Sequence, residues 1–568
     1  MKRRILSVVL VLTVAVTMVL GSGVSVFGEI EQVKTPTAGA TKWAVKPGGS
    51  MTPPMLYQER LYVAAGKYVY IINKDNGAVV KKSVQLAGPL GYTTVPVTCA
   101  DGKVFVPITG GKVDILDASS LTRIRTTEGV DSGQTITPVV YQDGFLYTGT
   151  YRPSGEKGSY ICIEAATGKI KWRQENPHGF YWAGACKVNQ TMIFGSEDGQ
   201  ADGRNGDATL YAWNTSAGEK TDALSLPGSG DIRSTIVYDE KTGCVCFTSK
   251  AGRFYKVKLN GDGKFSQTEV SYVDLGGAST STPVIYNGKA YVGVNGTGTL
   301  AGKGMVKRID LATLEVDGTA VTPGYIQGEM LLSTGNGTPY LYGACNYLPG
   351  GICMINASSM AASSFFTPNS AQRQYGLSRV ICDSRGTLYY TNDSNYLMAV
   401  SSPVRITSSA GKGGKITASQ TVGSGAPSCS FTAAPNKYYY VSSLTVDGRN
   451  QGSKTSYTFY NVTSNHTIKA AFKKVAVPTK VKAAAGKKKA TIRWKRASGV
   501  NGYQVYRASK KKGKYKKVKT ITRAKTTKYI NKKLKKNKKY YYKIRAYKKV
   551  NGKTVYGAFS KTVKVKAK

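Results

Sequence analysis

The chain has very little histidine and almost no helical periodicity. Two histidines among 568 residues nearly exclude a histidine-rich metal site, because such sites need several imidazole ligands. His178 is left as the single candidate base for a nucleophile triad in the first four hundred residues, and it lies in a turn-like N-P-H-G segment. Beyond the first residues, apolar positions do not recur at helical spacing. The sequence therefore predicts an all-β protein without a histidine-based active site.

Adjacent cysteines are also absent. Nine cysteines are spread through the chain, and most lie within apolar segments. Export would permit disulfides, but the odd number and the apolar settings favour small buried hydrophobic side chains for most of them. Cys244 and Cys246 lack the C-x-x-C spacing of a metal site. We expect no metal-binding residues here.

Long apolar runs are missing except at the start. Residues 1–28 combine a basic beginning, the apolar run Ile5–Leu20 and small residues before Gly28, which is the pattern of a secretory signal peptide. A retained anchor is the alternative. No other segment approaches the roughly 20 apolar residues that span a bilayer, and the first cysteine, Cys99, argues against a lipid-modified N-terminus. We expect a secreted protein, extracellular or associated with the cell surface.

Acidic residues are missing from the last sixth of the chain. Residues 475–568 contain 34 Lys and Arg and no Asp or Glu, an asymmetry typical of an interaction module. Soluble surfaces normally mix both signs, so we expect salt-sensitive binding to anionic cell-wall polymers or polysaccharide. Nucleic acid is the weaker partner, because no base-reading motif accompanies the charge. The residues expected to bind a polyanion are Lys511, Lys512, Lys516, Lys517, Lys532, Lys533, Lys535, Lys536, Lys538 and Lys539.

A strand–turn–strand unit recurs along the first four hundred residues. Its clearest copy, Tyr160–Trp172, reads Y-I-C-I-E-A-A-T-G-K-I-K-W. The turns of the copies start roughly 44 to 50 residues apart, about the length of a four-stranded propeller blade. Asn and Asp suit these turns because their side chains bond the following backbone. The turns begin at Asn73, Asp117, Glu164, Asn214, Asn260, Asp310 and Asn356.

The last copy ends near Leu397–Val400 without a partner strand. Thr41–Val45, which contains Trp43, matches the outer strand Ile170–Trp172 of the clearest copy. We therefore expect the N-terminal strand to complete the final blade and to close the ring, which removes free sheet edges. The prediction is a β-propeller over residues 41–402 with eight blades; seven is the alternative count.

The repeat resembles that of the quinoprotein alcohol dehydrogenase-like (PQQ-repeat-like) propellers, whose blades carry A-x-D-x-x-T-G-x-x-x-W. Glu164 takes the Asp position, and Thr167, Gly168 and Trp172 match. The dehydrogenases of this family hold a quinone beneath a pair of adjacent cysteines, with calcium. This chain lacks the pair, and the family also contains non-enzymatic scaffolds. We therefore expect no cofactor-binding and no catalytic residues, with calcium in Ser196–Asp207 as an open alternative.

Two smaller β modules are expected after the propeller. Residues 403–474 resemble the bacterial repeat module of internalin-B type, on the strings V-D-G and N-H-T-I-K-A-A-F. Residues 475–568 resemble a fibronectin type III domain, an immunoglobulin-like sandwich. Trp494 occupies the position of the core tryptophan of that family, and Leu534 and Tyr540 occupy the positions of its tyrosine corner.

The order of these parts favours a non-enzymatic binding or scaffold protein of the bacterial cell envelope. The propeller would bind an unidentified protein or glycan, with Tyr151–Gly158 and Ser196–Asp207 as contact loops, and the basic module would anchor the protein. The alternative is an extracellular quinone-dependent oxidoreductase or a glycan-active enzyme. No paired carboxylates stand out for glycoside hydrolysis.

Overall fold

The computed structural model describes residues 30–91, 95–130, 133–151 and 157–568. The expected signal peptide therefore lies outside the described residues. The chain forms two compact units, one built from residues up to Thr37 and from 44–399, the other from 38–43 and 400–568. Among the described residues there is no α-helix, only the short 3₁₀ turns η1 (Gly298–Leu300) and η2 (Ser370–Gln372). No described helix could cross a membrane.

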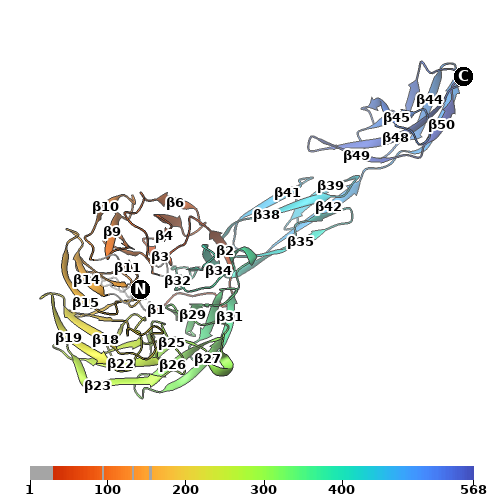
Figure 1. The fold of residues 1–568 in the computed structure, drawn as a ribbon. Helices are drawn as coiled ribbons and strands as arrows, with labels where there is room; N and C mark the ends of the chain where they lie inside the picture. Colours follow the sequence, from red (N-terminus) through yellow and green to blue (C-terminus); the bar gives the residue numbers. More distant parts are fainter. Residues whose placement is uncertain (1–29, 92–94, 131–132, 152–156) are drawn as a thin grey trace, which may run out of the picture. The chain divides into compact units, whose positions relative to one another are not determined.

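The described residues from 30 to 401 form eight sheets, and Figure 1 shows those of the first unit around a common centre. The first four sheets are β3 (Met55–Tyr57), β4 (Arg60–Ala65), β5 (Tyr68–Asn73) and β6 (Val79–Lys82); β7 (Thr98–Ala100), β8 (Lys103–Ile108), β9 (Lys112–Asp117) and β10 (Arg123–Thr126); β11 (Gln134–Thr135), β12 (Val140–Gln142), β13 (Phe145–Tyr151), β14 (Gly158–Glu164) and β15 (Ile170–Asn176); and β16 (Cys186–Val188), β17 (Thr191–Gly195), β18 (Ala208–Asn214) and β19 (Glu219–Leu226).

The other four sheets repeat this order, two of them with help from the N-terminal segment. They are β20 (Val237–Asp239), β21 (Cys244–Thr248), β22 (Arg253–Leu259) and β23 (Phe265–Asp274); β24 (Val284–Tyr286), β25 (Lys289–Asn295), β26 (Gly304–Asp310) and β27 (Val316–Thr322); β28 (Leu331–Ser333), β29 (Tyr340–Ala344), β30 (Ile352–Asn356) and β31 (Ala362–Phe366), joined by β1 (Ile30–Glu31); and β32 (Ile381–Cys382), β33 (Leu388–Thr391) and β34 (Leu397–Ser401), joined by β2 (Ala40–Val45).

Most neighbouring strands of a sheet follow one another in sequence, and pairs such as β3–β4, β4–β5 and β5–β6 are antiparallel, whereas β1 joins β28 in parallel. In the sheet of β32, β33 and β34, the fourth strand is β2, in the order β2-β34-β33-β32. The N-terminal strand thus occupies the position that the sequence predicts for it, with Trp43 buried. The all-β prediction is confirmed, and the first unit is a β-propeller.

The turns of the repeat lie between the last two strands of seven sheets. Five of the seven starting residues use a side-chain oxygen to accept backbone N–H groups two or three residues later. In the turn at Asp117, for example, Oδ1 accepts from the nitrogens of Ser119 and Ser120 at 3.0 and 2.7 Å. Asn73, Asn214, Asp310 and Asn356 make the equivalent bonds.

Glu164 differs because its side chain is one methylene longer. Its Oε2 accepts from the Thr167 hydroxyl at 2.5 Å instead. The backbone closes this turn: the Gly168 nitrogen donates to the Glu164 carbonyl at 2.7 Å, with Gly168 at φ +75°. Because a β-carbon is strained at this φ, glycine suits the position.

Trp172 packs one sheet against the next. It lies on β15, and its ring stacks on Trp213 of β18 with centroids 4.1 Å apart and an interplanar angle of 17°. Phe194 of β17 and Tyr147 of β13 complete the contact, at 6.4 and 5.9 Å. All four rings belong to one buried cluster that spans two sheets. The tryptophan of the repeat therefore contributes to packing between sheets.

The second unit begins with a module of eight strands that follows the propeller. Two sheets, in the orders β37-β35-β42-β39-β40 and β36-β38-β41, enclose a core that includes Ile406, Phe431 and Leu444. The strands are β35 (Pro403–Ala410), β36 (Gly414–Ile416), β37 (Gln420–Gly423), β38 (Ala426–Pro435), β39 (Tyr439–Val446), β40 (Arg449–Asn450), β41 (Ser456–Val462) and β42 (His466–Lys474).

The last module also consists of two sheets, β43-β44-β47 and β46-β45-β48-β49, with β50 paired to β48. Trp494, Leu534 and Tyr540 are buried in its single core. The Tyr540 hydroxyl accepts from the Lys535 nitrogen at 3.0 Å. The strands are β43 (Thr479–Gly486), β44 (Lys489–Lys495), β45 (Gly502–Ala508), β46 (Lys516–Ile521), β47 (Lys528–Asn531), β48 (Lys539–Val550), β49 (Lys553–Phe559) and β50 (Val563–Lys566).

All nine cysteines are free thiols in this structure. Eight are buried, and Cys186 is half-buried. Burial raises the pKa of Cys186 to about 11 and that of Cys162 to about 12, because desolvation disfavours the thiolate. These side chains therefore behave as small apolar groups at neutral pH.

The stacked tryptophans provide a test of the packing. Trp172→Ala should lower the free energy of unfolding of the propeller by about 3–5 kcal/mol, because it leaves a cavity between two sheets. Urea titration followed by near-ultraviolet circular dichroism measures the change. Trp172→Phe, which keeps an aromatic ring, should cost less. Equal stability of Trp172→Ala and the unaltered protein would contradict the role assigned to the stack.

Candidate functional site

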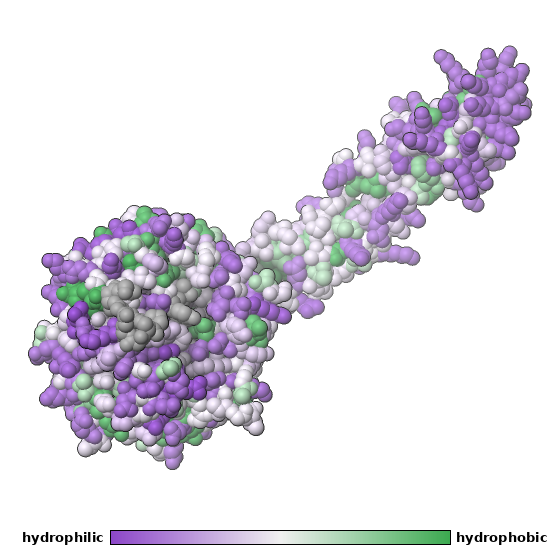
Figure 2. Space-filling view, in the orientation of Figure 1, coloured by the Kyte–Doolittle hydropathy of each residue, from purple (hydrophilic) through white to green (hydrophobic). Residues whose placement is uncertain are grey.

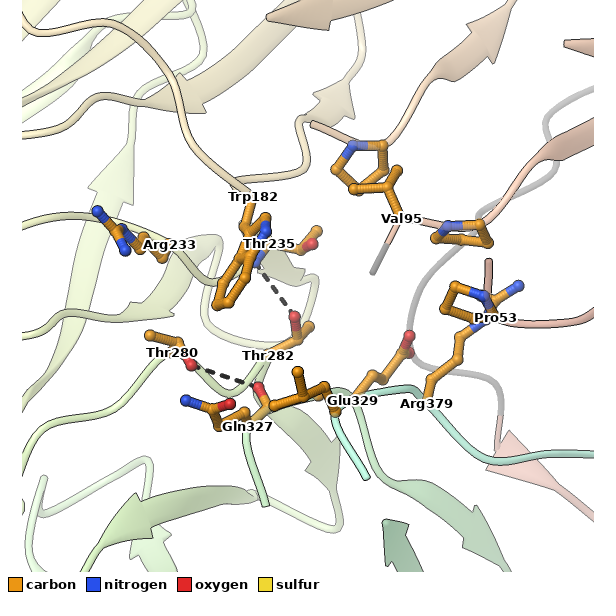
Figure 3. A pocket seen from close by; sticks show the side chains of 14 residues that line it. Pro53, Val95, Trp182, Arg233, Thr235, Thr280, Thr282, Gln327, Glu329 and Arg379 are labelled. Atoms are coloured by element: carbon orange, nitrogen blue, oxygen red, sulfur yellow. Dashed lines mark hydrogen bonds between the residues drawn. The ribbon is translucent and has the colours of Figure 1, made fainter. Parts of the chain in front are cut away.

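A central cavity lies where segments from all eight sheets of the propeller converge. Each lining residue lies two to four positions before the first strand of its sheet, except Pro138, which lies two positions before β12. The sheets therefore contribute equivalent positions to the cavity (Figure 3). The lining residues are Pro53, Val95, Pro96, Pro138, Trp182, Arg233, Thr235, Thr280, Thr282, Gln327, Gly328, Glu329, Leu377 and Arg379.

The cavity is small and of mixed chemistry. Its volume is about 90 Å³, whereas pockets for drug-sized ligands hold roughly 300–1,000 Å³. Proline, valine, leucine and tryptophan side chains provide apolar walls, and threonine hydroxyls, one amide, one carboxylate and two guanidinium groups provide polar ones. A second, wider hollow of about 810 Å³ lies beside it and shares Leu377. The central cavity as structured suits a small group or a single side chain.

Hydrogen bonds tie neighbouring segments of the lining together. The Thr235 nitrogen donates to Thr282 Oγ1 at 3.2 Å, and Thr280 Oγ1 donates to the Gln327 carbonyl at 3.5 Å, as Figure 3 shows. Ser281 Oγ reaches the Gly328 carbonyl at 3.1 Å. The residues involved are 47 positions apart in each pair, one repeat length. The bonds therefore fix each lining segment to that of the next sheet.

A cluster of buried charges adjoins the cavity through Arg233. Its Nε donates to Glu197 Oε1 at 3.0 Å, and a second bond joins its Nη2 to Glu197 Oε2. Nη2 also lies 3.0 Å from Asp231 Oδ2, which pairs with Lys250 Nζ at the same distance. Glu197 and Asp231 are almost completely buried. Removing one partner of such a pair leaves an uncompensated buried charge, so the four side chains act as a unit.

Burial has a large effect on Glu197. It raises the pKa of this carboxyl from 4.5 to about 8, although the bonds from Arg233 oppose the shift. Those same bonds raise the pKa of Arg233, so the guanidinium stays charged throughout. The charge of the Glu197 carboxyl therefore changes near neutral pH.

Arg233 also contacts two aromatic rings. Its guanidinium lies 4.1 Å from the ring centroid of Tyr181 and 6.0 Å from that of Trp182. Tyr181 in turn meets Tyr151 edge to face at 4.8 Å. A guanidinium held between carboxylate and aromatic partners is fixed in position. Arg233 therefore links the buried cluster to the lining of the cavity.

The carboxylates of the loop Ser196–Asp207, for which calcium is the open alternative, accept hydrogen bonds from backbone nitrogens. Asp198 accepts from the nitrogens of Gln200 and Gly206 at 2.8 and 2.9 Å, and Asp207 accepts from the nitrogen of Gly228 at 2.8 Å. Backbone donors thus occupy carboxylate oxygens that a calcium ion would need. Of the other predicted contact loop, Tyr151–Gly158, residues 152–156 lie outside the described residues.

The quinone and calcium that the family resemblance implies do not fit the described site. No described group of three or more His, Cys, Asp or Glu side chains is arranged to hold a metal, and Glu329 is the single carboxylate in the described lining. The cavity volume of about 90 Å³ is also small for a tricyclic quinone. Adjacent cysteines are absent from the sequence.

The ten predicted polyanion-binding lysines are all exposed on the last module. They fall into two groups, one from the segment before β46 into that strand, the other from the segment after β47 into the first residue of β48. Hydrophilic residues dominate the visible surface of this module in Figure 2. The residues of the central cavity, by contrast, were not predicted from the sequence. A Pro or Thr shortly before a short strand, as at Pro138 and Thr282, was the available signal.

Comparison with known proteins identifies one part of the chain. Residues 404–476 match the family model of the divergent InlB B-repeat domain, which confirms the bacterial repeat module expected after the propeller. No curated protein sequence is similar enough to count as a match.

The chain is also similar to several solved structures. The quinohemoprotein alcohol dehydrogenase from Comamonas testosteroni is 11% identical over 64% of this chain and 76% of its own, with a TM-score of 0.48. BamB from Moraxella catarrhalis is 13% identical over 64% of this chain and 97% of its own, with a TM-score of 0.45. A europium-containing methanol dehydrogenase is 10% identical over 62% and 84%, with a TM-score of 0.49. Sequence identities and TM-scores at this level do not indicate that this chain shares an activity with these proteins.

The raised pKa of Glu197 predicts a pH dependence of stability. Between pH 4.5 and about 8 the folded protein binds a proton that the unfolded chain has released, so stability should fall as pH rises through this window. The slope is of order 1 kcal/mol per pH unit. Urea titration at several pH values measures it. Glu197→Gln, which cannot ionise, should remove this slope; a variant that keeps the full slope would refute the assignment to Glu197.

Proposed function

We propose that this chain is an exported, non-enzymatic binding or scaffold protein of the bacterial cell envelope. The eight sheets of the first unit are eight blades that present a partner-binding surface, and the last module is a basic fibronectin type III sandwich that anchors the protein to anionic polymers. The observation that carries this proposal is the charge of residues 475–568, with 34 basic and no acidic residues.

The charge of this module faces solvent and has no internal counter-charge. All ten lysines of the two groups are exposed, so their ammonium groups add to a positive field that no carboxylate of the module reduces. Such a field attracts polyanions, displaces their counterions and weakens with added salt. A module that served solubility alone would need fewer charges, mixed in sign.

The neighbouring domains support a location at the cell surface. A divergent InlB B-repeat domain lies between the propeller and the basic module, and repeats of this type resemble those of exported surface proteins. The N-terminal segment has the pattern of a signal peptide. Among the described residues of the propeller, no group of side chains is arranged to hold a metal, and the central cavity is small. These features favour a binding role over quinone-dependent oxidation.

The proposed anchoring can be tested on the full chain. We expect it to sediment with purified anionic wall polymer at 50 mM NaCl and to be released at several hundred millimolar, because the contacts are ionic. Replacing the ten lysines by Gln should weaken binding by on the order of tenfold or more. The substituted residues are Lys511, Lys512, Lys516, Lys517, Lys532, Lys533, Lys535, Lys536, Lys538 and Lys539.

A matched control separates local from total charge. Ten exposed lysines of the first unit, replaced by Gln, lower the net charge equally and should leave binding nearly unchanged. Binding that ignores salt, or equal losses in the two variants, would refute anchoring by the last module. The control residues are Lys67, Lys81, Lys82, Lys112, Lys157, Lys169, Lys220, Lys241, Lys264 and Lys303.

A further inference from the structure

One sheet of the last module has an outer face made of alternating cations and aromatic rings. Along β48, Tyr542, Ile544 and Ala546 point into the core and are fully buried. The residues between them, Lys543 and Arg545, lie on the opposite face and are partly exposed, because successive side chains of a strand alternate between faces.

The strand register places aromatic residues beside these two cations. Arg545 pairs with Gln504 of β45 and with Phe559 of β49, and Lys543 pairs with Tyr506 of β45. Directly paired residues point to the same face. We call the set Gln504, Tyr506, Lys543, Arg545, Tyr556 and Phe559 the aromatic–cation face.

Arg545 is held rigidly in the middle of this face. Its Nε and Nη2 donate to Gln504 Oε1 at 3.0 and 2.8 Å, and Nη2 also donates to the Tyr506 hydroxyl at 2.7 Å. The guanidinium carbon lies 3.9 Å from the ring centroid of Tyr556 and 5.2 Å from that of Phe559. Both rings remain 36% exposed. Uncharged partners therefore orient the cation and leave its charge uncompensated.

Lys543 is held in a similar way. Its Nζ lies 4.2 Å from the ring centroids of both Phe559 and Tyr515. The first unit treats its partly buried arginines differently: Arg233 and Arg308 each pair with a carboxylate. Because residues 475–568 contain no carboxylate side chain, the charges on this face are available to an external anion.

We propose that the aromatic–cation face binds an anionic polysaccharide, with its sugar rings against Tyr556 and Phe559 and its acidic groups on Arg545 and Lys543. The Arg545 guanidinium is fixed in one orientation, and its Nη1, which makes none of these hydrogen bonds, can donate to an oxygen of a carboxylate or phosphate. The polarised C–H groups on one side of a sugar ring pack against the electron-rich face of an aromatic ring. This inference rests on the proposed anchoring function and names the surface and the polymer class.

The surrounding charge supports an extended ligand. Lys517 of β46 pairs with Tyr506 and so shares the face, and it belongs to the exposed lysines described above. A polymer that crosses the strands would contact these lysines as well as the central pair. The lysines would then supply attraction that depends on charge alone, and the face would supply preference for sugar rings.

The test uses the full chain and four polymers at fixed salt: polygalacturonate, polyphosphate, dextran and single-stranded oligo-dT. Polygalacturonate has rings and charge, polyphosphate has charge only, and dextran has rings only. Arg545→Gln with Lys543→Gln should weaken polygalacturonate binding at least tenfold. Tyr556→Ser with Phe559→Ser should weaken it several-fold while polyphosphate binding stays unchanged. Lys549→Gln with Lys553→Gln, on the same sheet but outside the face, is the control with equal charge loss.

The outcomes distinguish this inference from the proposed function. If the ten-lysine variant loses binding but the face variants keep it, the aromatic–cation face is not the site, and anchoring by charge stands. The polysaccharide assignment is wrong if the control pair weakens polygalacturonate binding as much as Arg545→Gln with Lys543→Gln does. It is also wrong if oligo-dT binds more tightly than polygalacturonate and the same variants weaken oligo-dT binding. If the full chain binds none of the charged polymers, both proposals fail. Near-ultraviolet circular dichroism checks that each variant is folded.

Discussion

Sheets that are apolar on both faces determine the architecture of the first unit. In β4, for example, Leu61, Tyr62 and Val63 follow one another and are each at most 1% exposed, although successive side chains point to opposite faces. One such sheet alone would expose the apolar side chains of both faces, and a sheet with a single neighbour would still expose half of them, at a cost of about 25 cal/mol per Å² of apolar surface. Each sheet is therefore stable only between two others, and a closed ring is the arrangement that gives every sheet two neighbours.

This constraint also explains why the recognisable repeat says little about function. Its turn lies between the last two strands of a sheet and its tryptophan lies on the last strand, where Trp172 packs on Trp213 of the next sheet. The residues that converge on the central cavity precede the first strands instead. The two sets share no position within the repeat. A match to the repeat therefore identifies the fold and does not specify the residues of the cavity.

The sequence allowed much of the fold to be predicted, because regularly spaced Asx turns and alternating strands are local features. Even the return of β2 to β34 follows from a local similarity between Trp43 and Trp172. The candidate site could not be predicted in this way. Glu197 and Arg233 are 36 residues apart and meet only through packing of two sheets. The first strands before which the cavity residues lie are two or three residues long, too short to show a period.

The second unit uses charge differently from the first. Arginines of the propeller are mostly neutralised by carboxylates, so its surface is electrically mixed. In the last module, aromatic rings and an amide hold Arg545 without neutralising it. The alternation Tyr-Tyr-Lys-Ile-Arg-Ala-Tyr in β48 was visible in the sequence, but the register that brings Phe559 beside Arg545 was not.

Hydrogen–deuterium exchange of the full chain, with and without saturating polygalacturonate, tests most directly where the protein holds an anionic surface polymer. The account predicts slower exchange in β45, β48 and β49 of the last module and little change in the propeller. Slower exchange confined to the segments around the central cavity, with the last module unaffected, would contradict it.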